Sequence, residues 1–173
     1  MEGLSHRIAR LMGPIFASAV IDAPREQVFP LLADLACRPG FMDHFQQSFR
    51  LERLESKGVG AAARFRVEPP RNGAWAETVI ERLDAPHMIQ ERGHSGRWSR
   101  VPTRTVWELL EGPGSGMTVK VAFWTQPTHP LDRLKELGGS RWYRRQLEGA
   151  LERLREVAES EQPQGVRMAT AGG

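Results

Sequence analysis

Two titratable side chains, Glu77 and His94, are the candidates for proton transfer in this sequence. Glu77 lies in the strand-like run AWAETVIERL, where the odd-numbered residues from Trp75 to Leu83 share one face. If that face lines an enclosed apolar space, Glu77 can act there as a general acid or base. If it meets water, Glu77 is an ordinary surface charge, which is the interpretation we favour. The alternation of apolar and polar residues does not decide between the two.

The run HMIQERGHSGRWSR contains a second group, in which Arg92, His94 and Trp98 could lie at the mouth of a cavity and bind an anionic end of a ligand. The same three residues could equally form an exposed loop, and the sequence leaves this choice open. None of the five histidines has the spacing of a metal site such as His-Glu-x-x-His. We therefore expect neither a metal ion nor another cofactor.

Tryptophan is the most informative aromatic residue, because the chain has five tryptophans beside a single tyrosine. An indole ring offers a broad apolar surface and one N–H donor, which suits contact with a ring-shaped ligand. Filling the core is the alternative role, and the commoner one. Trp107 is the best candidate for ligand contact, since it shares a strand face with Thr105 and Leu109 while Arg104 and Glu108 take the other face.

These side chains need a scaffold, and its clearest element is a helix between Gly138 and Ser160. Its apolar residues recur at intervals of three and four, as on one stripe of an amphipathic helix. The stripe consists of Tyr143, Leu147, Ala150, Leu151, Leu154, Val157 and Ala158. Burying a Leu- or Val-sized side chain stabilises a fold by about 1.5–3 kcal/mol, so we expect the helix to cover another apolar surface.

Strands supply that surface. A first strand in PIFASAVID is followed by a helix in DAPREQVFPLLADL and a shorter helical turn in RPGFMDHF. Six more strand-like runs come next, separated by turn residues: SFRLERLES, GAAARFRVEP, AWAETVIERL, HMIQERG, RTVWELLE and MTVKVAFWTQ. Alternation in the second and the last of these runs places the apolar residues on one face. We therefore expect an antiparallel sheet with one buried face.

Composition is typical of a single globular domain, since the chain has 173 residues, 40% of them hydrophobic and 26% charged. We expect residues 1–13 to form a lead-in segment, residues 14–160 the domain and residues 161–173 a disordered tail. The net charge of +3 comes without a long basic stripe, so nucleic acid is not an expected partner. No segment approaches the ~18 apolar residues of a membrane span. The single cysteine, Cys37, makes the cytoplasm the default location, and the oligomeric state is left open.

Taken together, four stretches resemble the START-like, or helix-grip (SRPBCC), superfamily and within it the polyketide cyclase/dehydrase group. They are SAVIDAPREQVFPLLADL, similar to its strand, Ala-Pro and helix; GVGAAARFRV, similar to its glycine-led strand; ERLDAPHMI, similar to its strand, Asp-x-Pro turn and strand; and GGSRWYRRQLEGALERLRE, similar to its closing helix. The resemblance covers residues 14–159. It implies an α+β helix-grip fold, with a seven-stranded curved antiparallel sheet wrapped around a long C-terminal helix and two short helices after the first strand.

The resemblance also implies a cavity between sheet and helix that holds a hydrophobic or amphipathic small molecule, such as a lipid, a polyketide or an aromatic compound. Our candidates for its lining are Phe41, Phe65, Trp75, Trp107, Leu109, Val121, Phe123, Tyr143 and Leu147. Some members of the superfamily transport or sense a ligand, and others cyclise or dehydrate polyketides. Because the superfamily has no invariant catalytic signature, the resemblance does not say whether this chain is an enzyme.

Three functions therefore remain open. The first is a non-catalytic protein that encloses a hydrophobic small molecule, which we favour because no proton-transfer pair is evident. The second is a polyketide cyclase or dehydratase in which Glu77, His94 or both move protons on an enclosed substrate. The third is a protein-interaction module whose core, filled by tryptophans, leaves no cavity for a ligand.

Overall fold

The computed structural model describes residues 12–69, 73–112, 116–127 and 139–160. The tail expected at residues 161–173 lies outside these ranges, as does the expected lead-in segment except for its last two residues. Those two residues belong to the first strand, which begins at Met12.

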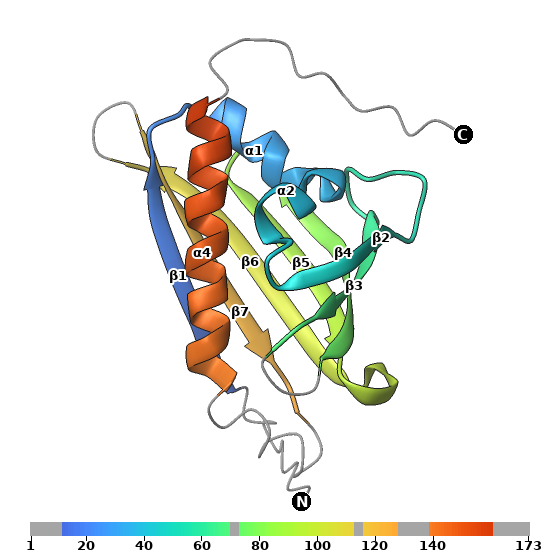
Figure 1. Cartoon of the computed structure of the whole chain (residues 1–173). Coiled ribbons are helices and arrows are strands. Elements are labelled where there is room, and N and C mark those ends of the chain that lie inside the picture. The colour runs from blue at the N-terminus through green and yellow to red at the C-terminus, as the bar shows by residue number, and fades with distance from the viewer. Residues whose placement is uncertain (1–11, 70–72, 113–115, 128–138, 161–173) are drawn as a thin grey trace, which may run out of the picture.

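One antiparallel sheet of seven strands forms the framework of the protein (Figure 1). The strands are β1 (Met12–Ile21), β2 (Gln46–Leu51), β3 (Ala62–Val67), β4 (Ala74–Asp84), β5 (Met88–Ser95), β6 (Val101–Glu111) and β7 (Met117–Thr125). Each strand from β2 to β7 lies beside its neighbour in sequence, and β1 pairs with β7 at the far edge. The curled seven-stranded antiparallel sheet confirms the architecture predicted from the sequence.

Short helices connect β1 to β2, and a long helix follows β7. They are α1 (Arg25–Ala33), the 3-10 helix η1 (Leu35–Cys37), α2 (Pro39–Met42) and α4 (Gly139–Ser160); a further 3-10 helix, η2 (Arg97–Ser99), lies between β5 and β6. α1 begins after Pro24 and continues through Pro30. Pro39 stands in the first turn of α2, where its missing N–H group removes no helical hydrogen bond. The predicted α+β helix-grip arrangement is therefore confirmed.

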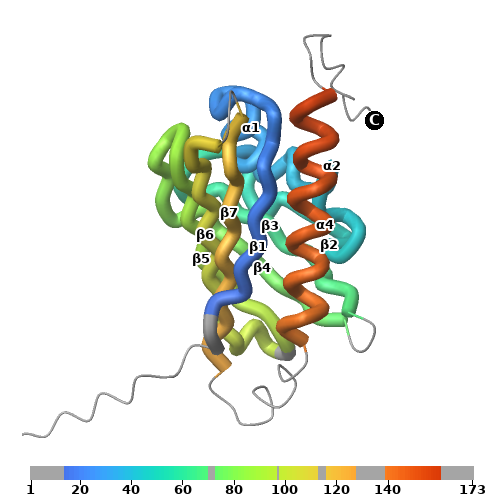
Figure 2. Tube along the Cα trace, turned by 90° about the vertical axis from the view of Figure 1, so that its left-hand side faces the viewer, coloured from blue at the N-terminus to red at the C-terminus, as the bar shows by residue number. Residues whose placement is uncertain are grey.

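α4 lies across the concave side of the sheet and packs against β1 (Figures 1 and 2). Its buried residues are Leu147, Ala150, Leu151, Leu154 and Ala158, all members of the predicted stripe. They belong to the same core cluster as Val119 and Val121 of β7, which are fully buried. The apolar stripe of the helix thus closes the buried face of the sheet.

A bulge in β4 changes which residues of that strand face the core. The register between β4 and β5 shifts between Ile80 and Arg82. Before the bulge Ala76 and Ile80 are buried, whereas after it Leu83 packs against the core. One extra residue in a strand reverses the alternation beyond it. This is why residues 75–83 show no consistent inner face in the sequence.

Candidate functional site

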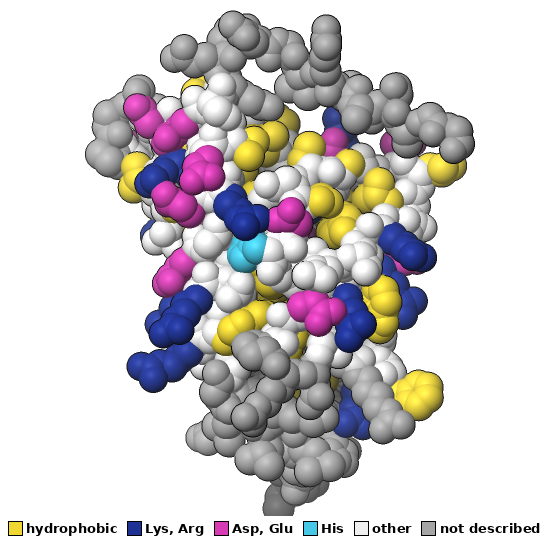
Figure 3. Space-filling view, viewed as in Figure 1, with side chains coloured by type: hydrophobic (Ala, Val, Ile, Leu, Met, Phe, Trp, Pro, Cys, Tyr) yellow, Lys and Arg dark blue, Asp and Glu magenta, His cyan; other side chains and the backbone are white. Residues whose placement is uncertain are grey.

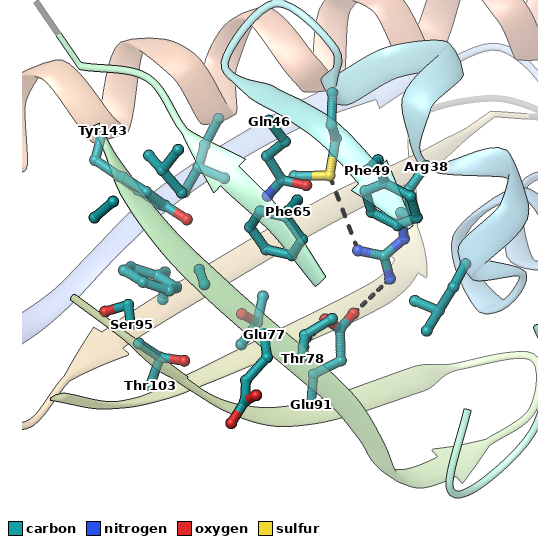
Figure 4. A pocket seen from close by; sticks show the side chains of 18 of the residues that line it. Arg38, Gln46, Phe49, Phe65, Glu77, Thr78, Glu91, Ser95, Thr103 and Tyr143 are labelled. Carbon is teal, nitrogen blue, oxygen red and sulfur yellow. Dashed lines mark hydrogen bonds and ion pairs between the residues drawn. The ribbon is translucent and has the colours of Figure 1, made fainter. Parts of the chain in front are cut away.

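A pocket of about 190 Å³ lies between the concave face of the sheet and α4 (Figure 4). Its wall combines aromatic side chains, including Phe49, Phe65 and Phe123, with polar side chains from several strands. Phe49 and Phe65 stack face to face with their ring centroids 5.8 Å apart. A mostly apolar wall with a few polar groups is the usual chemistry of a small-molecule site.

An ion pair between Arg38 and Glu91 forms part of the pocket wall, although the two side chains are only 4% and 3% exposed. Arg38 directly precedes α2, and Glu91 occupies an inward position on β5. Burying a charge costs several kcal/mol, and the attraction within a buried pair offsets this only with good geometry and additional hydrogen bonds. The surrounding residues provide those hydrogen bonds.

Both oxygens of the Glu91 carboxylate have partners. Oε1 accepts hydrogen bonds from Arg38 Nη2 and from Trp107 Nε1, the latter at 2.9 Å, and Oε2 accepts one from Thr78 Oγ1 at 2.8 Å. Arg38 also donates from Nε and Nη2 to the carbonyl oxygen of Leu32, at 3.2 and 2.8 Å. Its guanidinium carbon lies 4.9 Å from the centre of the Trp107 ring. These contacts join β4, β5 and β6 to the segment before α2 and fix Trp107 in the pocket wall.

Tyr143 contributes a hydroxyl group to the pocket from α4. Its ring stacks on Phe123 with centroids 4.3 Å apart and meets Phe45 edge to face at 5.7 Å. Burial raises the pKa of the Tyr143 hydroxyl, and the negative charge of Glu91 raises it further. The hydroxyl therefore stays protonated at neutral pH and can donate a hydrogen bond.

Five of the nine residues predicted to line a cavity line this pocket. They are Phe65, Trp107, Phe123, Tyr143 and Leu147. The structure places Phe41, Leu109 and Val121 elsewhere in the buried core. Trp75 lies outside the pocket with 40% of its surface exposed, and the guanidinium carbon of the exposed Arg64 sits 5.0 Å from the centre of its ring.

The three charged candidates, Glu77, Arg92 and His94, direct their charged groups away from the pocket. His94 Nδ1 lies 3.2 Å from Glu77 Oε1 across β4 and β5, and both side chains are nearly half exposed. Figure 4 shows the Glu77 carboxylate directed away from the pocket, although other parts of the residue line it. Arg92 pairs with Glu81, and Trp98 in η2 is 80% exposed. Arg92 and His94 face outward because the even-numbered residues of β5 do so.

Three polar residues of the pocket, Arg38, Gln46 and Glu91, were not among the predicted site residues. Glu91 carries a signal in the sequence, because it follows Ile89 at the interval of two that places both on one strand face. A carboxylate on a buried face requires a partner. Arg38 and Gln46 carry no comparable signal, since their local sequence does not say which part of the sheet they approach.

The surface seen in Figure 3 carries charges of both signs along α4, while hydrophobic side chains gather beside it over α1 and α2. Within the described residues, no group of three or more His, Cys, Asp or Glu side chains could hold a metal ion. In the same part of the chain, no helix has the length and apolar character needed to cross a membrane.

Comparison with known proteins gives matches in structure. No protein-family model and no curated protein matches the sequence. The KanY protein, 14% identical, has a TM-score of 0.68, with 84% of this chain and 97% of that protein covered. A protein from Thermus thermophilus, 20% identical, has a TM-score of 0.67, with 86% and 99% covered.

A START superfamily protein from Mycobacterium smegmatis also matches, at 13% identity and a TM-score of 0.57, with 82% of this chain and 99% of that protein covered. At these identities the likeness establishes the fold alone. The chain has the START-like, helix-grip fold that the four sequence stretches predicted.

Proposed function

We propose that this protein binds a hydrophobic or amphipathic small molecule in the pocket between the sheet and α4. The observation that carries the proposal is an apolar, aromatic-walled pocket in which polar groups such as the Tyr143 hydroxyl face the interior. Small-molecule sites combine an apolar wall, which supplies affinity, with a few polar groups that orient the ligand. The START-like fold, which the sequence resemblance associates with enclosed apolar ligands, supports the same function.

The volume of the pocket favours a compact ligand. At about 190 Å³ it is smaller than the ~300–1,000 Å³ common among small-molecule sites. We therefore expect a molecule of one or two rings, or a short chain, rather than a long lipid. The stacked pairs Phe49–Phe65 and Phe123–Tyr143 offer ring surfaces that suit a flat ligand.

Two features favour binding over the alternatives. The proton-transfer candidates Glu77 and His94 pair with each other on the outer face, and the carboxylate that does line the pocket, Glu91, has both oxygens engaged. A general base must reach the proton that it abstracts, so this arrangement gives a cyclase or dehydratase little support. A pocket beside Trp107 likewise argues against a core that tryptophans fill completely.

A pocket-filling substitution tests the proposal. Ala76 lines the pocket, so Ala76→Leu adds three carbon atoms inside it. We expect this variant to bind one- and two-ring aromatic compounds about tenfold more weakly, equivalent to about 1.4 kcal/mol, because the added side chain occupies the ligand's space. Titration calorimetry and native mass spectrometry against a panel of such compounds and short fatty acids measure the affinity and the stoichiometry.

Ala36→Leu is the matched control, because Ala36 is exposed in η1 and should leave every affinity unchanged. Thermal unfolding of both variants checks that the fold is retained. Failure of the whole panel to bind at millimolar concentration, or equal affinities for the wild type and Ala76→Leu, would contradict the proposal.

A further inference from the structure

The charged groups of the pocket are already engaged by the protein. Among the described residues that line the pocket, Arg38 is the only cationic one. Its Nε and Nη2 donate to the Leu32 carbonyl, Nη2 also donates to Glu91, and Nη1 points to Met42 Sδ at 4.0 Å. Glu91 accepts from three donors, as described above. An ionised ligand would therefore find no uncommitted opposite charge in the pocket wall.

Gln46, unlike Arg38 and Glu91, has a side chain that no other described residue engages. Its side chain is 6% exposed and lines the pocket, and its amide makes no hydrogen bond to any other residue that the structure describes. Among the described residues, the buried side-chain atoms that lack a partner are Arg25 Nε and His44 Nδ1, so the nitrogen and oxygen of the Gln46 amide remain open to the space in the pocket. Figure 4 shows this amide directed into the pocket. A ligand in the pocket can therefore bond to this amide without displacing a partner supplied by the protein.

The Tyr143 hydroxyl is a second neutral group of this kind. It has no hydrogen-bond partner within the described ranges, and in Figure 4 it points across the pocket toward the Gln46 amide. Ser95 of β5 and Thr103 of β6 line the pocket from the strands of the sheet and add two more hydroxyl groups. Uncommitted donors and acceptors thus come from β2, β5, β6 and α4, and all of them are uncharged.

We infer that the pocket selects uncharged ligands that carry a hydroxyl or carbonyl group, which Gln46 and Tyr143 bind between them. The inference rests on the proposed function, because it assigns a chemical class to the ligand of that same pocket. Gln46 offers both a donor and an acceptor, and Tyr143 offers a protonated hydroxyl, so either a hydroxyl or a carbonyl can be bound. A carboxylate would be desolvated near Glu91 without a free cation, which opposes its binding.

Three matched probes separate the contributions of the ring, of a neutral polar group and of a negative charge to the affinity. Naphthalene, 2-naphthol and 2-naphthoate share one ring system. At pH 7 naphthalene presents no polar group, 2-naphthol a neutral hydroxyl and 2-naphthoate a carboxylate. Benzene, phenol and benzoate repeat the comparison with one ring. We expect the hydroxyl compound of each series to bind about tenfold more tightly than the hydrocarbon, as one or two neutral hydrogen bonds allow. The carboxylate should bind more weakly than either, as measured by titration calorimetry and ligand-observed nuclear magnetic resonance.

Two substitutions locate the effect. Gln46→Leu and Tyr143→Phe each remove one polar group while keeping most of the side-chain volume. We expect each to reduce the preference for 2-naphthol over naphthalene by about threefold without lowering the affinity for naphthalene, because the apolar contacts of the pocket wall remain. If Gln46 or Tyr143 had only a structural role, its substitution would lower the affinities for naphthalene and for 2-naphthol together. Gln47→Leu is the matched control, since the neighbouring Gln47 is exposed on β2 and should preserve the preference.

The outcomes separate this inference from the proposed function. Tightest binding by the carboxylates, or equal binding by hydrocarbon and hydroxyl compounds, overturns the inference while the pocket remains a binding site. A hydroxyl preference that survives in both Gln46→Leu and Tyr143→Phe also overturns it. Failure of all six probes overturns the inference, and failure of the short fatty acids of the earlier panel as well removes the proposed function.

Discussion

The substitution Glu91→Gln probes the polar cluster in the pocket wall directly. It keeps the shape of the side chain and an acceptor for Trp107, and its NH2 group can donate to the Thr78 hydroxyl, but it removes the negative charge that pairs with Arg38. Arg38 is 4% exposed, so its positive charge would remain in the core without a counterion. We therefore expect Glu91→Gln to destabilise the protein strongly, even though the substitution changes few atoms.

The expected loss in the free energy of unfolding follows from the burial of both Arg38 and Glu91. Removing one member of a buried ion pair costs about 3–5 kcal/mol, because the remaining charge is left uncompensated. We expect about 3 kcal/mol for Glu91→Gln, at the low end, since the amide preserves an acceptor for Trp107 and Arg38 keeps its hydrogen bonds to Leu32. Total stabilities of domains are about 5–15 kcal/mol, so this loss is readily measured.

A double-mutant cycle with Arg38→Met isolates the pair. Urea unfolding of the wild type, Glu91→Gln, Arg38→Met and the double variant gives four free energies of unfolding. Because the double variant has no unpaired charge, its loss should be smaller than the sum of the two single losses by about 1–3 kcal/mol. Asp43→Asn is the control, since it breaks an exposed pair with Arg153 and should cost no more than about 1 kcal/mol.

Two results would refute this reasoning. One is a cost for Glu91→Gln no larger than that of Asp43→Asn, which would mean that the buried charge of Arg38 finds compensation elsewhere. The other is strict additivity of Glu91→Gln and Arg38→Met, which would mean that the two residues do not interact energetically.

Two pH-dependent predictions concern Tyr143 of α4 and His44, which lies between α2 and β2. Tyr143 is the single tyrosine, so ultraviolet absorbance of the phenolate should show a pKa above 10.0 in the folded protein and near 10.0 after denaturation. The unfolded state then loses the proton first, so stability should fall as pH rises above about 10, and Tyr143→Phe should reduce that slope. His44 has a pKa lowered mainly by burial, partly opposed by its bond to the Gln146 carbonyl. The unfolded state takes up its proton first, so unfolding by urea should become easier as pH falls below 6.5. An unchanged acid slope in His44→Gln would contradict this assignment.

Much of the fold was predictable because the signals that define it are local. The stripe from Leu147 to Ala158 repeats at helical spacing, and the burial of α4 follows it. Trp107 and Leu109 alternate with exposed residues of β6, and both are buried as that alternation predicts. These patterns needed no knowledge of distant residues.

The polar part of the site was less predictable because it depends on departures from local pattern. The bulge between Ile80 and Arg82 reverses the faces of β4, so the apolar Leu83 beyond it did not show on which face Glu77 lies. Glu77 and His94 instead meet on the outer face, as cross-strand partners whose pairing is set by the β4–β5 register.

The sequence by itself determined the strands, the helices and the apolar residues that close the sheet against α4, because periodicity specifies the direction in which each side chain points from its own element. Only the tertiary structure decided what those side chains meet. Arg38 and Glu91 are 53 residues apart and form an ion pair, while Gln46 and Tyr143 come from opposite parts of the chain and face one pocket. Such encounters depend on how the sheet curls and where α2 and α4 pack, which are long-range results of packing the whole core.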